Sequence, residues 1–381
     1  MLSPSAVAAV RDAARAVLAG DDAPVFRLPA DVTADAFVEA TDRHRLMPFF
    51  SLNLDRLDLA DDLRATIAAR GQRERMPALM MARELFRAVD ALSDAGVRVL
   101  TFKGIALAQQ AYGDFTARGS GDLDLLVSPD DLVTARTALV DAGWAADPAY
   151  PEPGPSWAWR FVVSNFYELA LSGPTSAIDL HWAPDPNHSS LPPFDVLWGR
   201  RSTVELAGRP LDTLGSTDAL LQSCGHAAKD DWAWLRSLVD IHLLASAQHA
   251  LGEPPRLTRA QRRSLGVAFD GLGTPRTAPP AVHRAARLAG HRSLPLARRR
   301  QESELVTSVG RAPGHGTLMH LRRVGRGVSS LGDARRLVVT MVIPPGTLGD
   351  TTAASFTEAL GTSARRRSGR ARRRFIDWGR W

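Results

Sequence analysis

Two aspartates, separated by a single residue, interrupt an otherwise apolar run, GDLDLLV at 121–127. The run predicts a strand, and side-chain alternation places Asp122 and Asp124 on the same face of it. Aspartate is depleted in strands, and two like charges on one face repel each other. A divalent cation reverses that cost, because magnesium prefers carboxylate oxygens. The pair therefore favours a metal-binding role over a solvated edge strand.

A second acidic strand supplies a candidate third carboxylate. Asp179 interrupts the apolar segment AIDLHW at 177–182. Taken alone, this strand is equally compatible with an edge aspartate that faces water. His181 shares the face of Asp179 by the same alternation, so it is a candidate to contact a phosphate or the incoming group, or it has a structural role.

The hydrophobic periodicity changes along the chain from helical to strand-like. Helical spacing prevails from Ser5 to about Leu92, and a Ser128 cap with Pro129 predicts a helix that ends near Gly143. The other expected elements are strands at 97–102 and 123–127, a Pro- and Trp-rich loop at 145–160, hairpins at 165–182 and 202–214, and a helix from Ser216 or Thr217 towards Ala247.

Lysine is rare in this chain and therefore informative. Of the 47 basic residues only Lys103 and Lys229 are lysine, which indicates positions where a compact ammonium is needed. Lys103 and Gly104 follow the strand at 97–102 and precede a helical stretch, a place where a phosphate can approach backbone N–H groups. Arg118, in the glycine-rich loop before Asp122, is a candidate to bind a triphosphate, with a solvated loop arginine as the alternative.

The segment CGHAAKDDWAWLRSLVDIHLLA, 224–245, predicts a further wall of the site. His226 and Lys229, at i and i+3, lie on one helix face and are candidates to line a nucleotide cleft. Asp240 lies on that face if the helix is continuous, or it pairs with an arginine. Cys224 is interpreted as a small buried apolar residue.

The charge is distributed unevenly. Residues 256–381 contain 25 arginines and seven acidic residues, whereas residues 1–255 contain 22 basic and 34 acidic ones. The run RRRSGRARRRF at 365–375 is typical of a disordered basic tail. With one cysteine, no signal-peptide core at the N-terminus and no apolar stretch long enough to span a bilayer, we expect a cytoplasmic protein without a membrane segment.

In combination, the motifs resemble a bacterial family of largely uncharacterised nucleotidyltransferases within the DNA polymerase beta-like superfamily. The resemblance rests on the order FKGIALAQQAYGDFTARGSGDLDLLV, IDLHW and HAAKDDWAWLRSLVDIHLL and covers roughly residues 40–250. It implies an α+β fold with a small mixed sheet flanked by helices. It also implies two Mg²⁺ ions, with Mn²⁺ as a substitute, held by Asp122, Asp124 and Asp179, and an NTP, such as ATP, as nucleotide donor. The superfamily's Gly-Ser pair is replaced here by Lys103 and Gly104.

These observations predict four regions: a helical one at 1–92, a catalytic core at 93–215, a helical segment at 216–252 that completes the cleft, and a basic region at 253–381 with a disordered tail from about 362. The expected activity is transfer of a nucleoside monophosphate from an NTP to an acceptor, with release of pyrophosphate. A small molecule, a peptide or protein, and RNA are all open as acceptors. The alternative is a catalytically inactive nucleotide-binding or RNA-binding protein of the same fold. A P-loop kinase and a dinucleotide oxidoreductase are disfavoured because neither glycine-rich motif occurs.

Overall fold

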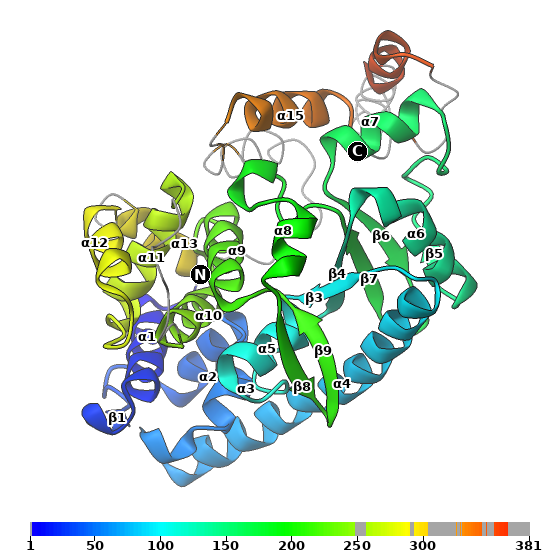
Figure 1. Ribbon diagram of the computed structural model, residues 1–381. Helices are drawn as coiled ribbons and strands as arrows, with labels where there is room; N and C mark the ends of the chain where they lie inside the picture. Colours follow the sequence, from blue (N-terminus) through cyan, green and yellow to red (C-terminus); the bar gives the residue numbers. More distant parts are fainter. Residues whose placement is uncertain are drawn as a thin grey trace, which may run out of the picture.

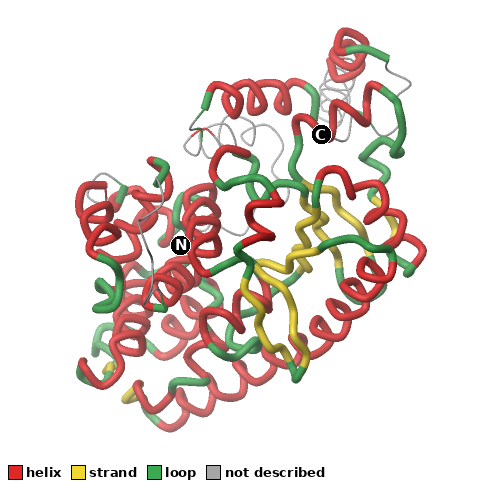
Figure 2. Tube along the Cα trace, in the orientation of Figure 1, coloured by secondary structure: helices red, strands yellow, loops and turns green. Residues whose placement is uncertain are grey.

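The computed structural model describes residues 2–247, 257–289, 293–303, 330–344 and 354–364, together with Gly325, Val328 and Leu348. Helices surround a central mixed sheet (Figures 1 and 2), so the expected α+β class is confirmed. The longer helices are α1 (Pro4–Ala19), α2 (Ala34–Arg43), α4 (Asp61–Asp94), α5 (Gly104–Tyr112), α6 (Leu132–Asp141), α7 (Trp157–Asn165), α9 (Ser216–Lys229), α10 (Leu235–Ser246), α11 (Arg259–Leu272), α12 (Pro280–Ala289), α13 (Leu294–Gln301) and α15 (Leu331–Val342), and the shorter ones are α3 (Met47–Ser51) and α8 (Phe194–Gly199).

Seven strands form the central sheet in the order β5-β6-β7-β4-β3-β9-β8. The inner strands β3 and β4 are antiparallel, while β4 is parallel to β7 and β3 is parallel to β9. Both expected hairpins, β6–β7 and β8–β9, are confirmed. The strands are β3 (Val99–Phe102), β4 (Asp122–Val127), β5 (Ala145–Ala146), β6 (Glu168–Ser172), β7 (Ala177–His181), β8 (Ser202–Leu206) and β9 (Arg209–Thr213).

The two faces of the sheet differ in polarity because side chains alternate along each strand. Leu123, Leu125 and Val127 of β4 pack with apolar residues of α4 and α6 in one core cluster. Ile178 and Leu180 of β7 belong to the same cluster. The residues between them are directed to the opposite face, which is where the polar side chains of β4 and β7 gather. Because one face of the sheet is buried in this cluster, the polar side chains of β4 and β7 are directed to the opposite face.

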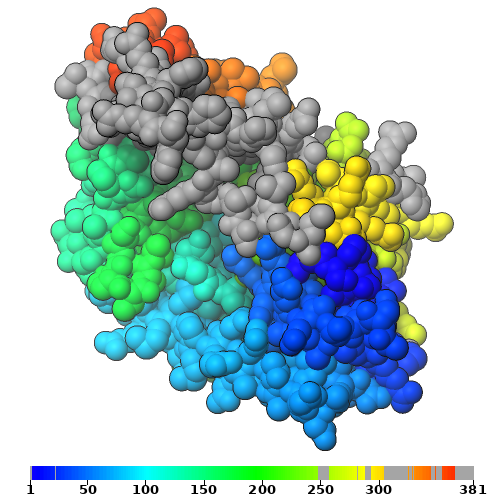
Figure 3. Space-filling model, turned by 180° about the vertical axis from the view of Figure 1, so that it is seen from behind, coloured from blue at the N-terminus to red at the C-terminus, as the bar shows by residue number. Residues whose placement is uncertain are grey.

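A second core cluster joins the N-terminal helices to α9, α10 and α11. In the space-filling view the N-terminal residues, in blue, lie beside the yellow segment that follows α11 (Figure 3). Two hydrogen bonds support this contact, from Arg11 to the Gln301 side chain at 2.9 Å and from Arg43 to the Ser303 carbonyl at 2.8 Å. The short parallel strands β1 (Phe26–Arg27) and β2 (Leu57–Asp58) also belong to this part of the chain, and the helical periodicity did not predict them.

The expected loop at 145–160 is wrong at both ends. Strand β5 pairs with β6 at its start, and helix α7 begins at Trp157. Ser156 caps this helix by accepting a hydrogen bond from the Trp159 amide, and Ala158, Phe161 and other apolar residues of α7 are buried against the sheet. The tryptophan and proline content therefore indicated a loop, but burial of the apolar side chains of α7 favours a helix from Trp157 onward.

The expected continuous helix from residue 216 to 247 is interrupted after Lys229. Asp231 and Trp232 have φ angles of 56° and 55°, which no right-handed helix contains. Trp232 is buried there, and its indole N–H donates to Ser264 Oγ at 2.8 Å. The first of the two helices has Gly215 at its N-cap position and begins at Ser216. By contrast, Ser128 does cap the short turn at Pro129–Asp131 that leads into α6.

Cys224 is fully buried, as expected. No helix among the described residues is both long and apolar enough to cross a membrane. The basic run at 365–375 lies outside the described residues.

Candidate functional site

The parallel pairing of β4 and β7 brings two predicted carboxylates side by side. Asp124 and Asp179 are register partners in this ladder. Both lie on the sheet face opposite to the one that carries Leu123 and Leu125. Asp124 is buried and Asp179 is half-buried. Residues 55 positions apart in the sequence therefore meet on one patch of the sheet.

His181, two residues beyond Asp179, completes a group of three potential metal ligands. One ligand atom each from Asp124, Asp179 and His181 lie within 4.8 Å of one another. The imidazole is fully buried, and its Nε2 lies 3.0 Å from Asp124 Oδ1. Phe102 packs edge-on against the ring at 4.9 Å between centroids. All three residues lie on paired strands of the sheet, and the group contains His181 where the predicted trio has Asp122.

Asp122 lies at the exposed first residue of β4, on the same face as Asp124. Partial removal from water and the charge of Asp124 raise its pKa. The loop before it is held by Ser120, whose Oγ donates to the Asp122 carbonyl at 3.1 Å. A Cβ on Gly104 would lie 2.7 Å from this Ser120 Oγ, and Gly104 has a φ of 44°. Glycine is thus required at 104 both for close approach and for its backbone conformation.

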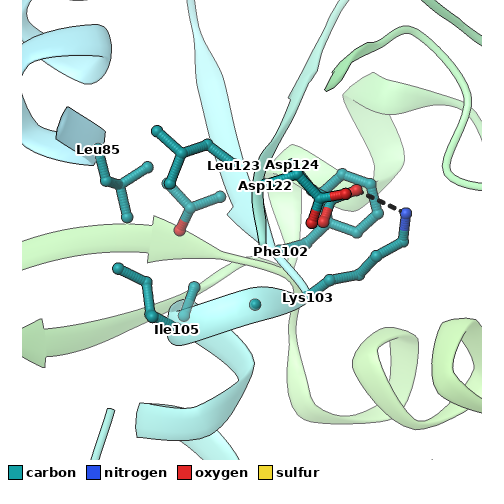
Figure 4. A pocket seen from close by; sticks show the side chains of 10 residues that line it. Leu85, Phe102, Lys103, Ile105, Asp122, Leu123 and Asp124 are labelled. Carbon is teal, nitrogen blue, oxygen red and sulfur yellow. Dashed lines mark hydrogen bonds and ion pairs between the residues drawn. The ribbon is translucent and has the colours of Figure 1, made fainter. Parts of the chain in front are cut away.

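Lys103 provides the positive charge at this patch. Its Nζ donates to Asp124 Oδ1 at 2.7 Å, and Lys103, Asp122 and Asp124 are among the residues that line a pocket at the end of β3 and the start of β4 (Figure 4). Burial opposes the charged form, but Asp124 and Glu168 raise the pKa of Lys103. In the same way burial opposes ionisation of Asp124, while Lys103 and His181 hold the pKa of that carboxyl well below its usual range.

Asp179 has the opposite electrostatic environment. Burial and the charges of Glu168, Asp124 and Asp122 raise its pKa to about 7. The two ladder partners therefore differ in their surroundings. Asp124 has an ammonium partner, whereas Asp179 faces mainly negative charge. Such a set has too little positive charge for its carboxylates, which is the situation that a divalent cation relieves.

Arg118 is neither solvated nor in a mobile surface position, so the loop-arginine alternative is wrong. It is buried, and its Nε lies 3.0 Å from both carboxylate oxygens of Asp240 in α10. Tyr112 donates to the same carboxylate at 2.7 Å. Asp240 therefore pairs with an arginine, which was one of the two interpretations of that residue.

His226 and Lys229 lie at the C-terminal end of α9. Burial and the positive charges of Lys229, Lys103 and Arg118 lower the pKa of His226 well below its usual value, so His226 lies in the same electrostatic environment as the carboxylate patch. The break after Lys229 separates both residues from Asp240, which belongs to α10.

Three polar residues of the site region were not predicted from the sequence. Glu168 of β6 pairs in register with His181 and lies 3.5 Å from its Nε2. Asp185 is buried beside Gly225, where a Cβ would lie 3.1 Å from Asp185 Oδ2. Arg236 of α10 is buried and donates to the Gly119 carbonyl at 2.5 Å. Of the three, only Glu168 could have been recognised from the sequence, as a charged residue in an apolar strand.

A family of known proteins is similar to this chain. No curated protein and no solved structure matches the chain at a significant level. A family model described as uncharacterised nucleotidyltransferase matches residues 30–269, a range that contains the carboxylate strands, the Lys103 turn and helices α9 and α10. Because this match covers more than half of the chain, the protein belongs to that nucleotidyltransferase family.

Proposed function

We propose that this protein transfers a nucleoside monophosphate from an NTP, such as ATP, to an acceptor hydroxyl in a Mg²⁺-dependent reaction. A bond forms between the acceptor oxygen and the α-phosphorus, and the bond from the α-phosphorus to the bridging oxygen of the β-phosphate breaks. Pyrophosphate leaves, and the hydroxyl proton passes to a base. The observation that carries this proposal is the juxtaposition of Asp124, Asp179 and His181 on one sheet face in a nucleotidyltransferase family member.

The residues present fit a divalent cation. Three ligand atoms lie within 4.8 Å of one another, and the pKa of Asp179, raised by burial and by neighbouring carboxylates, reflects unneutralised negative charge. In our proposal Asp124 and Asp179 hold magnesium, with Asp122 contributing to a second ion and manganese as a substitute. Bound there, magnesium supplies charge neutralisation on the transferring phosphate.

The remaining roles belong to the basic side chains around the patch. Lys103 and Arg118 neutralise phosphate oxygens, and Gly104 lets the phosphate approach the start of α5. His226 and Lys229 line the nucleotide side of the cleft. Asp179 accepts the proton of the acceptor hydroxyl, and His181 keeps Asp124 oriented through their 3.0 Å contact.

The acceptor is a hydroxyl of a small molecule, of a peptide or protein, or of an RNA 3′ end. The arginine-rich region after residue 256 favours a polyanionic partner, because clustered arginines neutralise phosphates. We also propose that the chain is divided into the four regions expected from the sequence. The proposed site of action is the cytoplasm.

Transfer of an α-³²P-labelled nucleoside monophosphate tests this function. Each of the four NTPs is incubated with magnesium, the full chain and a cell extract as acceptor source, and labelled product and pyrophosphate are measured. We expect Asp124→Asn to lower the rate about 100-fold or more, because the position of charge in the site is the main catalytic contribution. Asp195→Asn is the matched control, since Asp195 lies on the surface in an ion pair with Arg98.

Retention of full transfer by Asp124→Asn would contradict the assignment. Binding of NTP by the wild type without any pyrophosphate release would favour the alternative, a nucleotide-binding protein that has lost turnover.

A further inference from the structure

Arg236 is a buried cation that lacks a full set of partners. Its exposed fraction is 8 %, and one of its Nη atoms donates to the Gly119 carbonyl at 2.5 Å. Among the described residues, nothing bonds to its buried Nε. A guanidinium has five N–H donors, and burying its charge is costly unless an anion and further acceptors are present. Arg236 is therefore placed for a ligand that supplies oxygen acceptors.

The charges around Arg236 are also unbalanced. Asp240 is the acidic side chain that acts most strongly on it, but this carboxylate already accepts hydrogen bonds from Arg118 and Tyr112. Burial and the charge of Arg118 lower the pKa of Arg236 to about 9. Two buried arginines thus lie beside a carboxylate that is already bonded to one of them, and exposed Arg45 adds further positive charge nearby. An anion would balance this group.

The loop next to Arg236 leaves room for such an anion. Gly119 and Gly121 have no heavy atom within 4 Å of an added Cβ, and neither has a positive φ. The fold itself therefore does not require glycine at these two positions, and a ligand can approach the backbone closely there.

The site of this anion adjoins the carboxylate patch. The loop whose Gly119 carbonyl accepts the bond from Arg236 ends at Asp122, and Arg118 donates from one Nη to the Gly104 carbonyl, 3.5 Å away and next to Lys103. An anion bound at the arginines would therefore lie beside the strand that carries Asp122 and Asp124.

We propose that Arg236, together with Arg118 and the backbone of residues 119–121, binds the terminal phosphates of the nucleotide and then the pyrophosphate that leaves. This assignment rests on the proposed function for the identity of the phosphates. It adds Arg236 to the binding residues and gives the polyphosphate a direction, with its end towards α10 and its α-phosphate towards Asp124 and Asp179.

Inorganic pyrophosphate is the probe, and its affinity for the full chain is measured by titration calorimetry with magnesium present. We expect Arg236→Gln to weaken binding at least about tenfold, because it removes a charge-assisted contact. Gly119→Ala should also weaken binding while the thermal unfolding midpoint stays within error of the wild type. Arg98→Gln, which alters an exposed arginine beside Asp195, should bind like the wild type.

Three results would overturn the inference: no pyrophosphate binding by the wild type, unchanged binding by a folded Arg236→Gln variant, or unchanged binding by Gly119→Ala if Arg236→Gln does not fold. Failure of the proposed function is a separate result. In that case the wild type binds pyrophosphate through Arg236 but transfers no labelled nucleotide, so the anion site stands and the reaction does not.

Discussion

At the residue scale, Lys103 and Asp124 form the electrostatic centre of the site. The ammonium lies 2.7 Å from the carboxylate, and only 15 % of the lysine side chain is exposed. The backbone at Lys103 has a φ of 55°, an unfavourable conformation for any residue other than glycine. Such strain persists where the surroundings hold it, and here the ion pair and the start of α5 do so.

Lys103 is one of only two lysines among 47 basic residues, which predicts that a compact ammonium is needed at this position. We expect Lys103→Arg to lower kcat/KM for nucleotidyl transfer at least about tenfold, although the charge is kept. A planar guanidinium does not fit the position of a compact ammonium. The measurement is steady-state transfer with the preferred NTP, together with thermal unfolding to confirm the fold.

The matched control is Arg98→Lys, which makes the reverse change at an exposed ion pair and should leave transfer unchanged. Wild-type kinetics for Lys103→Arg would show that charge alone matters at this position.

At the element scale, the long helix α4 supports both core clusters. Its first half, with Leu63 and Ile67, packs with the N-terminal helices, and its second half, with Leu85 and Leu92, packs under the sheet. Helix α4 also runs along the sheet in Figure 1. The face of β4 that carries Asp122 and Asp124 is therefore oriented by what α4 buries on the other side.

Gly71 shows that packing between elements outweighs local helix propensity. An added Cβ would collide with Ser51 of α3 and would lie 3.0 Å from the Met47 carbonyl. Helix propensity alone predicts that Gly71→Ala stabilises the protein by about 1 kcal/mol. Overpacking costs about 1–3 kcal/mol, so we expect a net loss of about 1 kcal/mol in the free energy of unfolding, measured in urea.

A double-mutant cycle separates these two contributions. Removing the Ser51 side chain with Ser51→Gly should recover part of the loss caused by Gly71→Ala, because the colliding atoms are gone. An increase in stability for Gly71→Ala alone would show that α3 moves away without cost.

At the scale of the whole molecule, histidines that are wholly or partly buried couple folding to pH. Burial lowers the pKa of His44 to about 3 and the pKa of His188 and of His242 to about 4. His44 accepts a hydrogen bond at Nδ1 from the Leu235 amide, 3.3 Å away, and so links the end of α2 to the start of α10. Protonation of these residues is thus linked to opening of the core.

The sign of the effect follows from comparing the folded and unfolded states. Each histidine has a lower pKa when folded than its usual 6.5, so between pH 6.5 and about 4 the unfolded chain binds more protons. The contribution of the neutral histidines to the free energy of unfolding is fully present above pH 6.5. It falls as the pH drops through this window, by about 1.4 kcal/mol per pH unit for a fully buried histidine.

We expect His44→Asn to reduce the stability difference between pH 6.5 and pH 5 by about 2 kcal/mol relative to the wild type. Urea unfolding at the two pH values measures this. Asp179, whose raised pKa acts with the opposite sign, is present in both proteins and cancels in the comparison. An identical pH dependence in variant and wild type would show that His44 is not buried in its neutral form.

The same scale explains why parts of the site were predictable and others were not. Alternation within one strand is a local property, so the shared face of Asp122 and Asp124 followed from six residues. That His181 lies close to Asp124 depends on the register between β4 and β7, and this register is set by pairing between distant parts of the chain. Arg236 carried no signal, because a charged residue in an apolar helix is normally solvent-exposed.

By itself, the sequence determined the local elements that carry chemistry: the Asp122–Asp124 strand, the hairpin with Asp179 and His181, and the Lys103–Gly104 turn. Turn residues and side-chain periodicity act over a few positions, so they can be recognised without the fold. Only the tertiary structure decided that Asp124 meets Asp179 and that Arg118 pairs with Asp240, 122 residues away. Those contacts exist because two hydrophobic clusters bury opposite sides of the sheet, and burial on that scale is a property of the whole chain.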